Sequence, residues 1–157
     1  MLDFWQMFEK ILIALILGTI IGLERESVGK EAGIRTSIVV CVGATVFTLA
    51  GLSLPYIIGQ SPENISEILA RNSGFLAILA NIVVGIGFLG AGIIIKTEER
   101  IHGLTTAAII WFVAAIGLLI GIGLIKLATT TTILITSILY LLRKLGIIEK
   151  IKNQNNN

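Results

Sequence analysis

Uncharged apolar runs alternate with short charged segments along this chain. Most of the bulky hydrophobic residues fall into runs at 11–23, 36–62, 73–95, 103–125 and 127–142. Only α-helices and closed barrels satisfy their backbone hydrogen bonds inside a bilayer, and a helix of about 20 residues crosses a hydrocarbon core of roughly 30 Å. The pattern therefore predicts an all-α, polytopic membrane bundle of five transmembrane helices, with the lipid bilayer as its surroundings.

The ends of the runs set the expected helix boundaries. The first run is short for a crossing, so Trp5 and Phe8 are expected to extend its helix, and Lys10 is expected to snorkel toward water. The second helix is expected to end near Pro55 and Tyr56, because the residue before a proline is biased away from helical geometry. The helices are predicted at approximately 4–23, 36–56, 74–95, 104–121 and 124–142.

The composition leaves no stretch for a second, soluble domain. Hydrophobic residues make up 55% of the chain and charged residues 14%, which predicts one transmembrane domain over residues 4–142. A basic, asparagine-rich cytoplasmic tail is expected at 143–157, and a polar loop with a short amphipathic turn at 60–72. The net charge of +2 is too small and too dispersed for a nucleic-acid partner. Cys41 is the single cysteine, so no disulfide framework is expected, and a buried small side chain is the simplest interpretation.

The basic residues predict the orientation in the membrane. Five crossings place the termini on opposite sides, and nine of the twelve lysines and arginines fall on one side: Arg25, Lys30, Arg35, Lys96, Arg100, Arg143, Lys144, Lys150 and Lys152. By the positive-inside rule this side faces the cytoplasm. The loops at 24–35 and 96–102 are therefore expected in the cytoplasm, the loop at 60–72 and the amino terminus outside, and the carboxyl terminus inside.

Glycines recur within the apolar runs. The string Gly85-Ile-Gly-Phe-Leu-Gly90 formally matches the dinucleotide fingerprint GxGxxG, but it lies inside an apolar run without the preceding strand that the fingerprint requires. In a membrane helix, small residues allow close approach of a neighbouring helix. The glycines expected at such helix contacts are Gly18, Gly22, Gly85, Gly87, Gly90 and Gly92. A glycine-lined passage is the functional alternative.

Charged residues gather directly after the first run. This segment, residues 22–36, contains Glu24, Arg25, Glu26, Glu31 and Arg35. A solvated loop is one interpretation. The other is that some of these residues are drawn between helices, where an ionisable group needs a partner and usually marks a site. Carboxylates from this loop and the next could hold Mg²⁺ through its waters, but spacing alone does not bring them together, so no metal site is assigned.

A few polar residues lie in or next to the remaining runs. Asn81 falls within the third run, where a hydrogen bond to a neighbouring helix is the simplest role. His102, Thr105 and Thr106 open the fourth helix, where hydroxyl groups cap free N–H groups and the helix end is positive. No serine, histidine and carboxylate arrangement suggests nucleophilic catalysis. We therefore expect that the protein is not an enzyme and that it binds no cofactor.

Four motifs together resemble the MgtC/SapB family. They are Gly22-Leu-Glu-Arg-Glu26, Ala32-Gly-Ile-Arg-Thr36, Gly85-Ile-Gly-Phe-Leu-Gly-Ala-Gly92 and Gly103-Leu-Thr-Thr-Ala-Ala108 with Trp111. The resemblance implies a multi-pass protein of a bacterial or archaeal inner membrane with five crossings. With Asn81, the matching positions form the candidate functional cluster: Glu24, Arg25, Glu26, Arg35, Thr36, Asn81, Gly103, Thr105, Thr106 and Trp111.

The resemblance also implies a function. Well-studied relatives are associated with growth in low magnesium and survival inside host cells, and one restrains the proton-translocating ATP synthase. Longer relatives carry a soluble domain after the last crossing, so a short form without it is expected here. Some relatives have asparagine where this chain has Thr105, which favours a housekeeping homologue.

Two functions follow as hypotheses. The first is a regulatory protein that binds a membrane partner, such as the ATP synthase, through small-residue helix faces. The second is a transporter or channel for Mg²⁺ or another small ion. No acidic residue lies in the middle of any apolar run, although a cation path through hydrocarbon would normally require one, and this argues against transport. A homo-oligomer is compatible with both.

Overall fold

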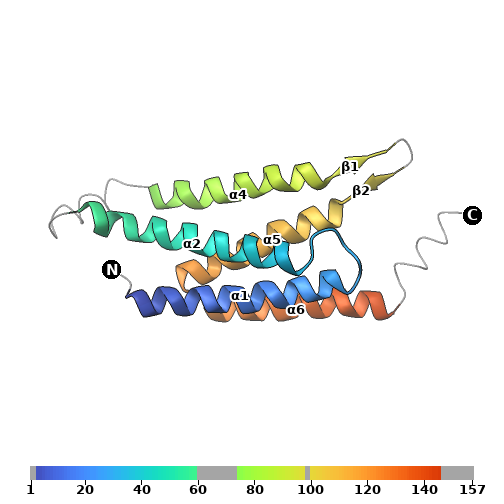
Figure 1. Cartoon of the computed structure of the whole chain (residues 1–157), viewed down its shortest axis with the longest axis horizontal. Helices are drawn as coiled ribbons and strands as arrows, with labels where there is room; N and C mark the ends of the chain where they lie inside the picture. Colours follow the sequence, from blue (N-terminus) through green and yellow to red (C-terminus); the bar gives the residue numbers. More distant parts are fainter. Residues whose placement is uncertain (1–2, 60–73, 98–99, 146–157) are drawn as a thin grey trace, which may run out of the picture.

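The computed structural model describes residues 3–59, 74–97 and 100–145, and its helices run along one long axis (Figure 1). In chain order the elements are α1 (Phe4–Glu26), α2 (Ile34–Ile58), α4 (Gly74–Ile93), β1 (Ile95–Lys96), β2 (Ile101–His102), α5 (Leu104–Ile122) and α6 (Ile125–Lys144). Helices α1, α2, α5 and α6 are long and apolar enough to cross a membrane, and α4 contains the shorter apolar helix Ala77–Ile93. The predicted all-α membrane bundle is confirmed. The loop expected at 60–72 and the tail beyond residue 145 lie outside the described residues.

Helix α1 continues through charged residues. Its last backbone bond joins the Ser27 N–H to the Leu23 carbonyl at 3.0 Å, so Glu24, Arg25 and Glu26 belong to the final helical turn. A basic side chain such as Arg25 is favourable there, because the carboxyl end of a helix carries partial negative charge. The charged segment thus starts inside a helix.

Helix α2 continues past its proline. The helix is expected to end near Pro55 and Tyr56, and in the structure it extends to Ile58. Pro55 has no N–H to donate, but the Gly59 N–H still donates to the Pro55 carbonyl at 2.9 Å, so hydrogen bonding continues beyond the proline.

Two short strands join α4 to α5, where the sequence predicts only a loop. Ile95 pairs with His102 and Lys96 with Ile101 in an antiparallel arrangement. Gly103 then adopts a φ of 81°, and a Cβ there would overlap the Ile93 carbonyl. A glycine at this position therefore allows the tight turn from β2 into α5.

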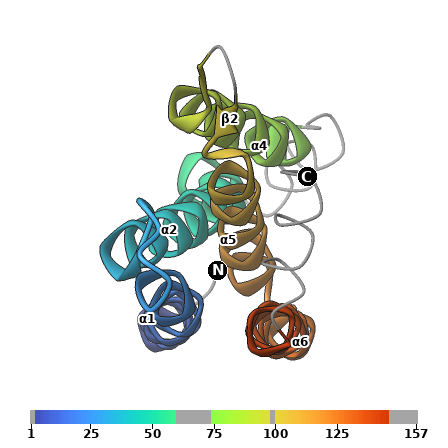
Figure 2. The same ribbon diagram turned by 90° about the vertical axis from the view of Figure 1, so that its right-hand side faces the viewer.

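The helices pack around α2 and α5. Helix α2 lies between α1 and α5, α4 lies on α2 and α5, and α6 packs on α1 and α5 (Figure 2). The buried apolar core between α1, α2 and α5 includes Leu17, Ile21, Cys41, Val113 and Ile116. Cys41 is fully buried, in agreement with its interpretation as a small core side chain.

Glycines set the closest helix contacts within this core. A Cβ on Gly18 would lie 3.0 Å from the Ser37 carbonyl oxygen, and a Cβ on Gly22 would lie 2.5 Å from the Ile34 Cα. On α5, a Cβ on Gly117 would overlap a backbone carbonyl of α2. The backbones of α1, α2 and α5 therefore approach each other where side chains are absent.

Three of the four glycines predicted to pack on α4 make no close contact with another helix of this chain. Nothing lies within 4 Å of a Cβ built on Gly85, Gly87 or Gly92, whereas a Cβ on Gly90 would lie 3.5 Å from the Ala107 Cβ of α5. Helix α4 lies at the edge of the bundle and meets α2 and α5 on one side only. The expectation of close packing within this chain is corrected for Gly85, Gly87 and Gly92.

Candidate functional site

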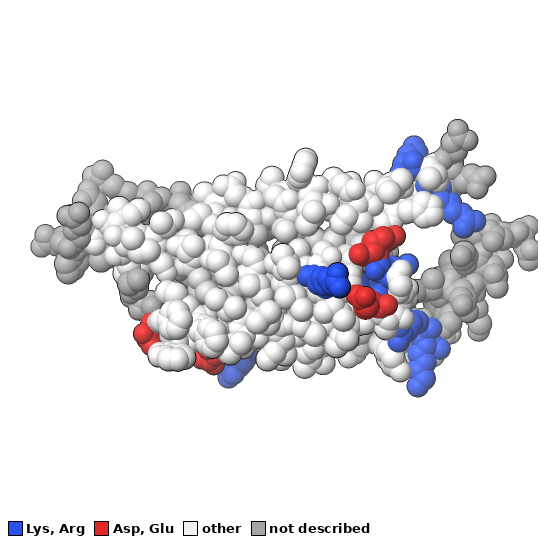
Figure 3. Space-filling model, viewed as in Figure 1, with Lys and Arg blue, Asp and Glu red and all other residues white. Residues whose placement is uncertain are grey.

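Charged side chains gather at the end of the bundle that carries β1 and β2. On the face shown in Figure 3, most of the blue and red atoms lie at this end, and the body of the bundle is uncharged. The carboxyl ends of α1 and α6 and the amino ends of α2 and α5 meet here (Figure 1). Most of the candidate cluster therefore belongs to one end of the molecule.

Glu24 and Arg25 form a buried ion pair in the last turn of α1. The Arg25 Nε lies 3.0 Å from the Glu24 Oε2, and the two side chains are 5% and 6% exposed. The distance is that of an ion pair, but the angle is not that of a hydrogen bond, and Glu24 Oε2 and Arg25 Nε and Nη1 have no hydrogen-bond partner among the described residues. For these two residues, burial favours the interpretation that they are drawn between helices.

The segment from residue 27 to residue 33 folds back onto the amino end of α2. The Glu26 Oε2 accepts a hydrogen bond from the Ile34 N–H at 3.0 Å, which places a carboxylate at the positive end of the helix. A Cβ on Gly33 would overlap this carboxylate, so a larger residue at position 33 would displace the Glu26 side chain from the Ile34 N–H. Glu26, Arg35 and Thr36 line a pocket of about 570 Å³ together with Glu31. Arg35 itself is exposed, as the solvated-loop interpretation expects.

Glu31 connects the loop after α1 to α5. The Thr106 hydroxyl, which is buried, donates to the Glu31 Oε2 at 3.3 Å. A hydrogen bond from its own backbone lowers the pKa of Glu31, and the Thr106 hydroxyl and the nearby Lys30 and His102 lower this pKa further. The contact joins residues 75 apart in sequence. The sequence analysis did not predict this contact. It assigned the Thr106 hydroxyl to helix capping and placed Glu31 in the charged segment after the first helix.

The remaining cluster residues do not converge on this end in the same way. Thr105 is exposed on the first turn of α5, Trp111 is 51% exposed farther along it, and Asn81 lies on α4. Within residues 3–59, 74–97 and 100–145, no three His, Cys, Asp or Glu side chains are grouped to hold a metal ion. The candidate cluster is therefore divided: most of it lies at the charged end, Trp111 lies farther along α5 and Asn81 lies on α4.

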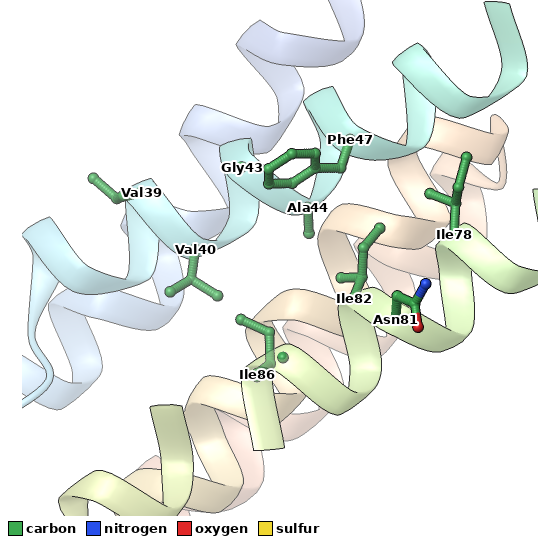
Figure 4. Close-up of a pocket in the computed structure, with 10 residues that line it drawn as sticks. Val39, Val40, Gly43, Ala44, Phe47, Ile78, Asn81, Ile82 and Ile86 are labelled. Carbon is green, nitrogen blue, oxygen red and sulfur yellow. The ribbon is translucent and has the colours of Figure 1, made fainter. Parts of the chain in front are cut away.

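Asn81 lines a groove between α2 and α4 (Figure 4). The groove has a volume of about 510 Å³, and Asn81 is the only residue with a polar side chain in its lining. The other lining residues are Val39, Val40, Gly43, Ala44, Phe47, Ile78, Ile82, Gly85 and Ile86. Nothing lies within 4 Å of a Cβ built on Gly43 or Gly85, so both walls of the groove are open at these positions.

Two further polar contacts were missed from the sequence. Lys10 is buried, and its Nζ donates to the Gly121 carbonyl at 2.9 Å, near the carboxyl end of α5. This contact replaces the expected snorkelling, because the helix end supplies the acceptor that water would otherwise provide. Arg143 donates to the Ser27 Oγ at 2.8 Å and lies over the Tyr140 ring at 5.1 Å, which joins the ends of α1 and α6.

Known proteins match most of the chain. The sequence model of the MgtC family matches residues 11–147. Protein MgtC of Brucella abortus (strain 2308) is 40% identical over 132 residues, which are 84% of this chain and 49% of that protein. Protein MgtC of Salmonella typhimurium (strain 14028s) is 40% identical over 134 residues, 85% of this chain and 51% of that protein. An uncharacterized protein of Haemophilus influenzae is 40% identical over 129 residues, 82% and 52% of the two chains. The chain spans about half the length of these curated relatives, and no solved structure matches it.

Proposed function

Because the chain belongs to the MgtC family, we propose that it is an inner-membrane protein that modulates a membrane partner when magnesium is scarce. The role in low magnesium is inferred from membership of the MgtC family. The proton-translocating ATP synthase is proposed as the partner from the family resemblance alone. We further propose that the charged end faces the cytoplasm and that the amino terminus lies outside. The proposal requires a surface for a partner and no catalytic residue.

The groove between α2 and α4 is the observation that supports partner binding. A transmembrane helix that packs on another helix gains affinity from close backbone contact and from hydrogen bonds between the two helices. Each such hydrogen bond is worth roughly 0.6–2 kcal/mol. Gly43 and Gly85 leave room for such close contact, and the exposed amide of Asn81 offers hydrogen-bond donors and an acceptor. The preferred occupant is a transmembrane helix that carries a small residue and a polar residue. A second copy of this chain is the alternative occupant.

Direct transport is less well supported by the packing. Gly18, Gly117 and Gly121 bring α1, α2 and α5 together so closely that an added Cβ would overlap or crowd backbone and side-chain atoms of α2. The buried Lys10 ammonium also lies near one end of this helix group, at the Gly121 carbonyl, where a divalent cation would be repelled. A passage for Mg²⁺ between these three helices would require them to separate.

Growth of a deletion strain in magnesium-poor medium tests the proposal. Plasmid-borne wild-type protein should restore growth, whereas Asn81→Leu should not, because the groove loses its hydrogen-bonding amide. Val84→Leu is the matched control, since Val84 is 70% exposed on the same helix and does not line the groove. Immunoblots of membrane fractions verify equal accumulation.

Two results would contradict the proposal. Full growth with Asn81→Leu would show that the amide in the α2–α4 groove is not needed for the function. If the wild-type protein accumulates normally in the membrane but does not improve growth in low magnesium, the protein has no role in adaptation to low magnesium. Cross-linking of two copies through the groove would show that its occupant is a second copy of this chain and not another protein.

A further inference from the structure

Helix α6 is held unevenly along its length. Its two buried residues, Ala128 and Thr132, both lie in its first half, and no residue from 133 to 144 is buried. The last turn of α1, by contrast, contains the buried side chains of Glu24 and Arg25, so this helix is fixed in the bundle up to its end. If one of the two helices moves against the other, the moving helix is therefore α6.

The amino end of α6 has the geometry of a pivot. Gly123 connects α5 to α6 with a φ of 107°, a conformation that favours glycine, and its N–H donates to the Leu119 carbonyl at 3.1 Å. The Lys10 Nζ donates to the nearby Gly121 carbonyl at 2.9 Å, and Ala128 is fully buried where α6 packs on α1 and α5. A tilt of α6 would therefore displace its amino end least and its carboxyl end most.

A pocket of about 610 Å³ separates the carboxyl-terminal halves of α1 and α6. Ile20, Leu23 and Glu24 are among the residues that line it from α1, and Ser137 and Leu141 are among those that line it from α6. Close-packed helices leave few spaces larger than a water molecule between them. Side-chain packing therefore holds these two halves together only weakly.

One side-chain contact joins the two helices beyond this pocket, at the charged end. The Arg143 Nη1 donates to the Ser27 Oγ at 2.8 Å, and the same guanidinium lies over the Tyr140 ring of its own helix at 5.1 Å. Within the part of the chain that the structure describes, no other side-chain hydrogen bond or ion pair joins α6 to another helix. Arg143 is exposed, and loss of one such hydrogen bond changes an equilibrium by about two- to tenfold. The contact is therefore weak enough to open and close.

We propose that α6 is a movable helix, held to α1 by the Arg143–Ser27 contact, and that its release uncovers the side of α1 that carries Glu24. The 15 residues from Ala128 to Arg143 span about 22 Å of helix. A tilt of about 10–20° about Ala128 therefore shifts the carboxyl end by about 4–8 Å, and tilts of this size are ordinary for transmembrane helices. This inference does not depend on the proposed function, because it uses a different pair of helices.

Distances between pairs of spin labels, measured by double electron–electron resonance on the purified full chain in lipid nanodiscs, test this movement. The native cysteine is first removed by Cys41→Ala. Labels at Lys30→Cys and Lys144→Cys report the charged end, and labels at Leu12→Cys and Leu127→Cys report the pivot end. All four label positions are exposed. The unmodified latching residues should give two distances about 4–8 Å apart at the charged end and one distance at the pivot end.

Two variants remove the Arg143–Ser27 contact from either side. Arg143→Ala and Ser27→Ala should each raise the ratio of the longer to the shorter distance at the charged end by about two- to tenfold. The double variant should raise it no further, because both changes remove the same hydrogen bond. Ser27→Ala keeps the test informative if Arg143→Ala does not fold. Arg100→Ala is the matched control, because Arg100 is an exposed arginine that belongs to neither α1 nor α6, and it should leave the ratio unchanged.

Three outcomes would overturn the proposal. A single distance at the charged end that neither Arg143→Ala nor Ser27→Ala changes would show that α6 is fixed. An equal change of distance at the pivot end would show that the whole helix loosens and does not tilt. An equal effect of Arg100→Ala would assign the change to the loss of a positive charge and not to the loss of the contact with Ser27.

Discussion

Replacement of Gly117 on α5 by alanine should destabilise the bundle more than replacement of Gly87 on α4 by alanine. A Cβ at residue 117 would overlap the Cys41 carbonyl oxygen and lie 2.8 Å from the Ala44 Cβ. The backbone carbonyl cannot rotate away as a side chain could, so α5 must move from α2. Overpacking of this kind typically costs about 1–3 kcal/mol.

The same movement weakens a buried hydrogen bond. The Thr45 hydroxyl donates to the Gly117 carbonyl at 3.0 Å and also to the Cys41 carbonyl at 2.9 Å. Loss of a hydrogen bond costs about 0.5–1.5 kcal/mol, and the second acceptor keeps the loss at the lower end of this range. Together the two effects should lower the free energy of unfolding by about 1.5–3.5 kcal/mol.

Unfolding of the purified protein in mixed micelles, followed by circular dichroism as the denaturing detergent is increased, measures this change. Gly87→Ala is the matched control, because nothing lies within 4 Å of a Cβ there. It should leave the free energy of unfolding unchanged or raise it by up to about 1 kcal/mol, since alanine is the better helix former. Equal unfolding curves for the two variants would refute the proposed α2–α5 contact.

Three further predictions follow from the charged end of the bundle. Arg25→Ala should lower the free energy of unfolding by about 3–5 kcal/mol because it leaves the buried Glu24 carboxylate without its ion pair, whereas Lys30→Ala, at an exposed position, should change it by less than about 1 kcal/mol in the same assay. The pKa of Glu31 is below its ordinary value of 4.5, so its contribution to stability should be present above pH 4.5 and lost as the pH falls through the lowered folded-state pKa; melting curves at low pH should show this loss, and Thr106→Val should reduce it. With the native cysteine replaced, a cysteine at position 30 should react with an impermeant thiol reagent only from the cytoplasmic face and one at position 126 only from the outer face; the reverse pattern would invert the proposed topology.

The sequence predicts the helices well because their signal is local. Long apolar runs specify helices in a bilayer whatever their neighbours, and the structure adds only a few residues at the ends of α1 and α2. The end of α1 was placed too early because Glu24 and Arg25 interrupt the apolar run, although charged residues remain helical when they pair. A boundary set by hydropathy alone therefore misses a charged last turn.

The packing of the glycines could not be predicted in the same way. Gly18 and Gly22 on α1 lie at helix contacts, while Gly87 and Gly92, in an equally glycine-rich run, have no atom within 4 Å of a Cβ built on them. Spacing shows that a helix has small residues on a face, but only the position of α4 at the edge of the bundle decides whether that face meets a neighbour. Contacts such as Thr106 with Glu31 likewise join distant segments and leave no local pattern.

Uptake of Mg²⁺ into liposomes that contain the purified protein tests the central claim most directly, namely that the protein modulates a partner and does not itself carry the ion. An internal Mg²⁺-sensitive dye reports uptake across a range of external concentrations. We predict the same uptake as in protein-free liposomes. Saturable uptake that disappears in Glu24→Gln or Asn81→Leu would contradict the account and establish transport.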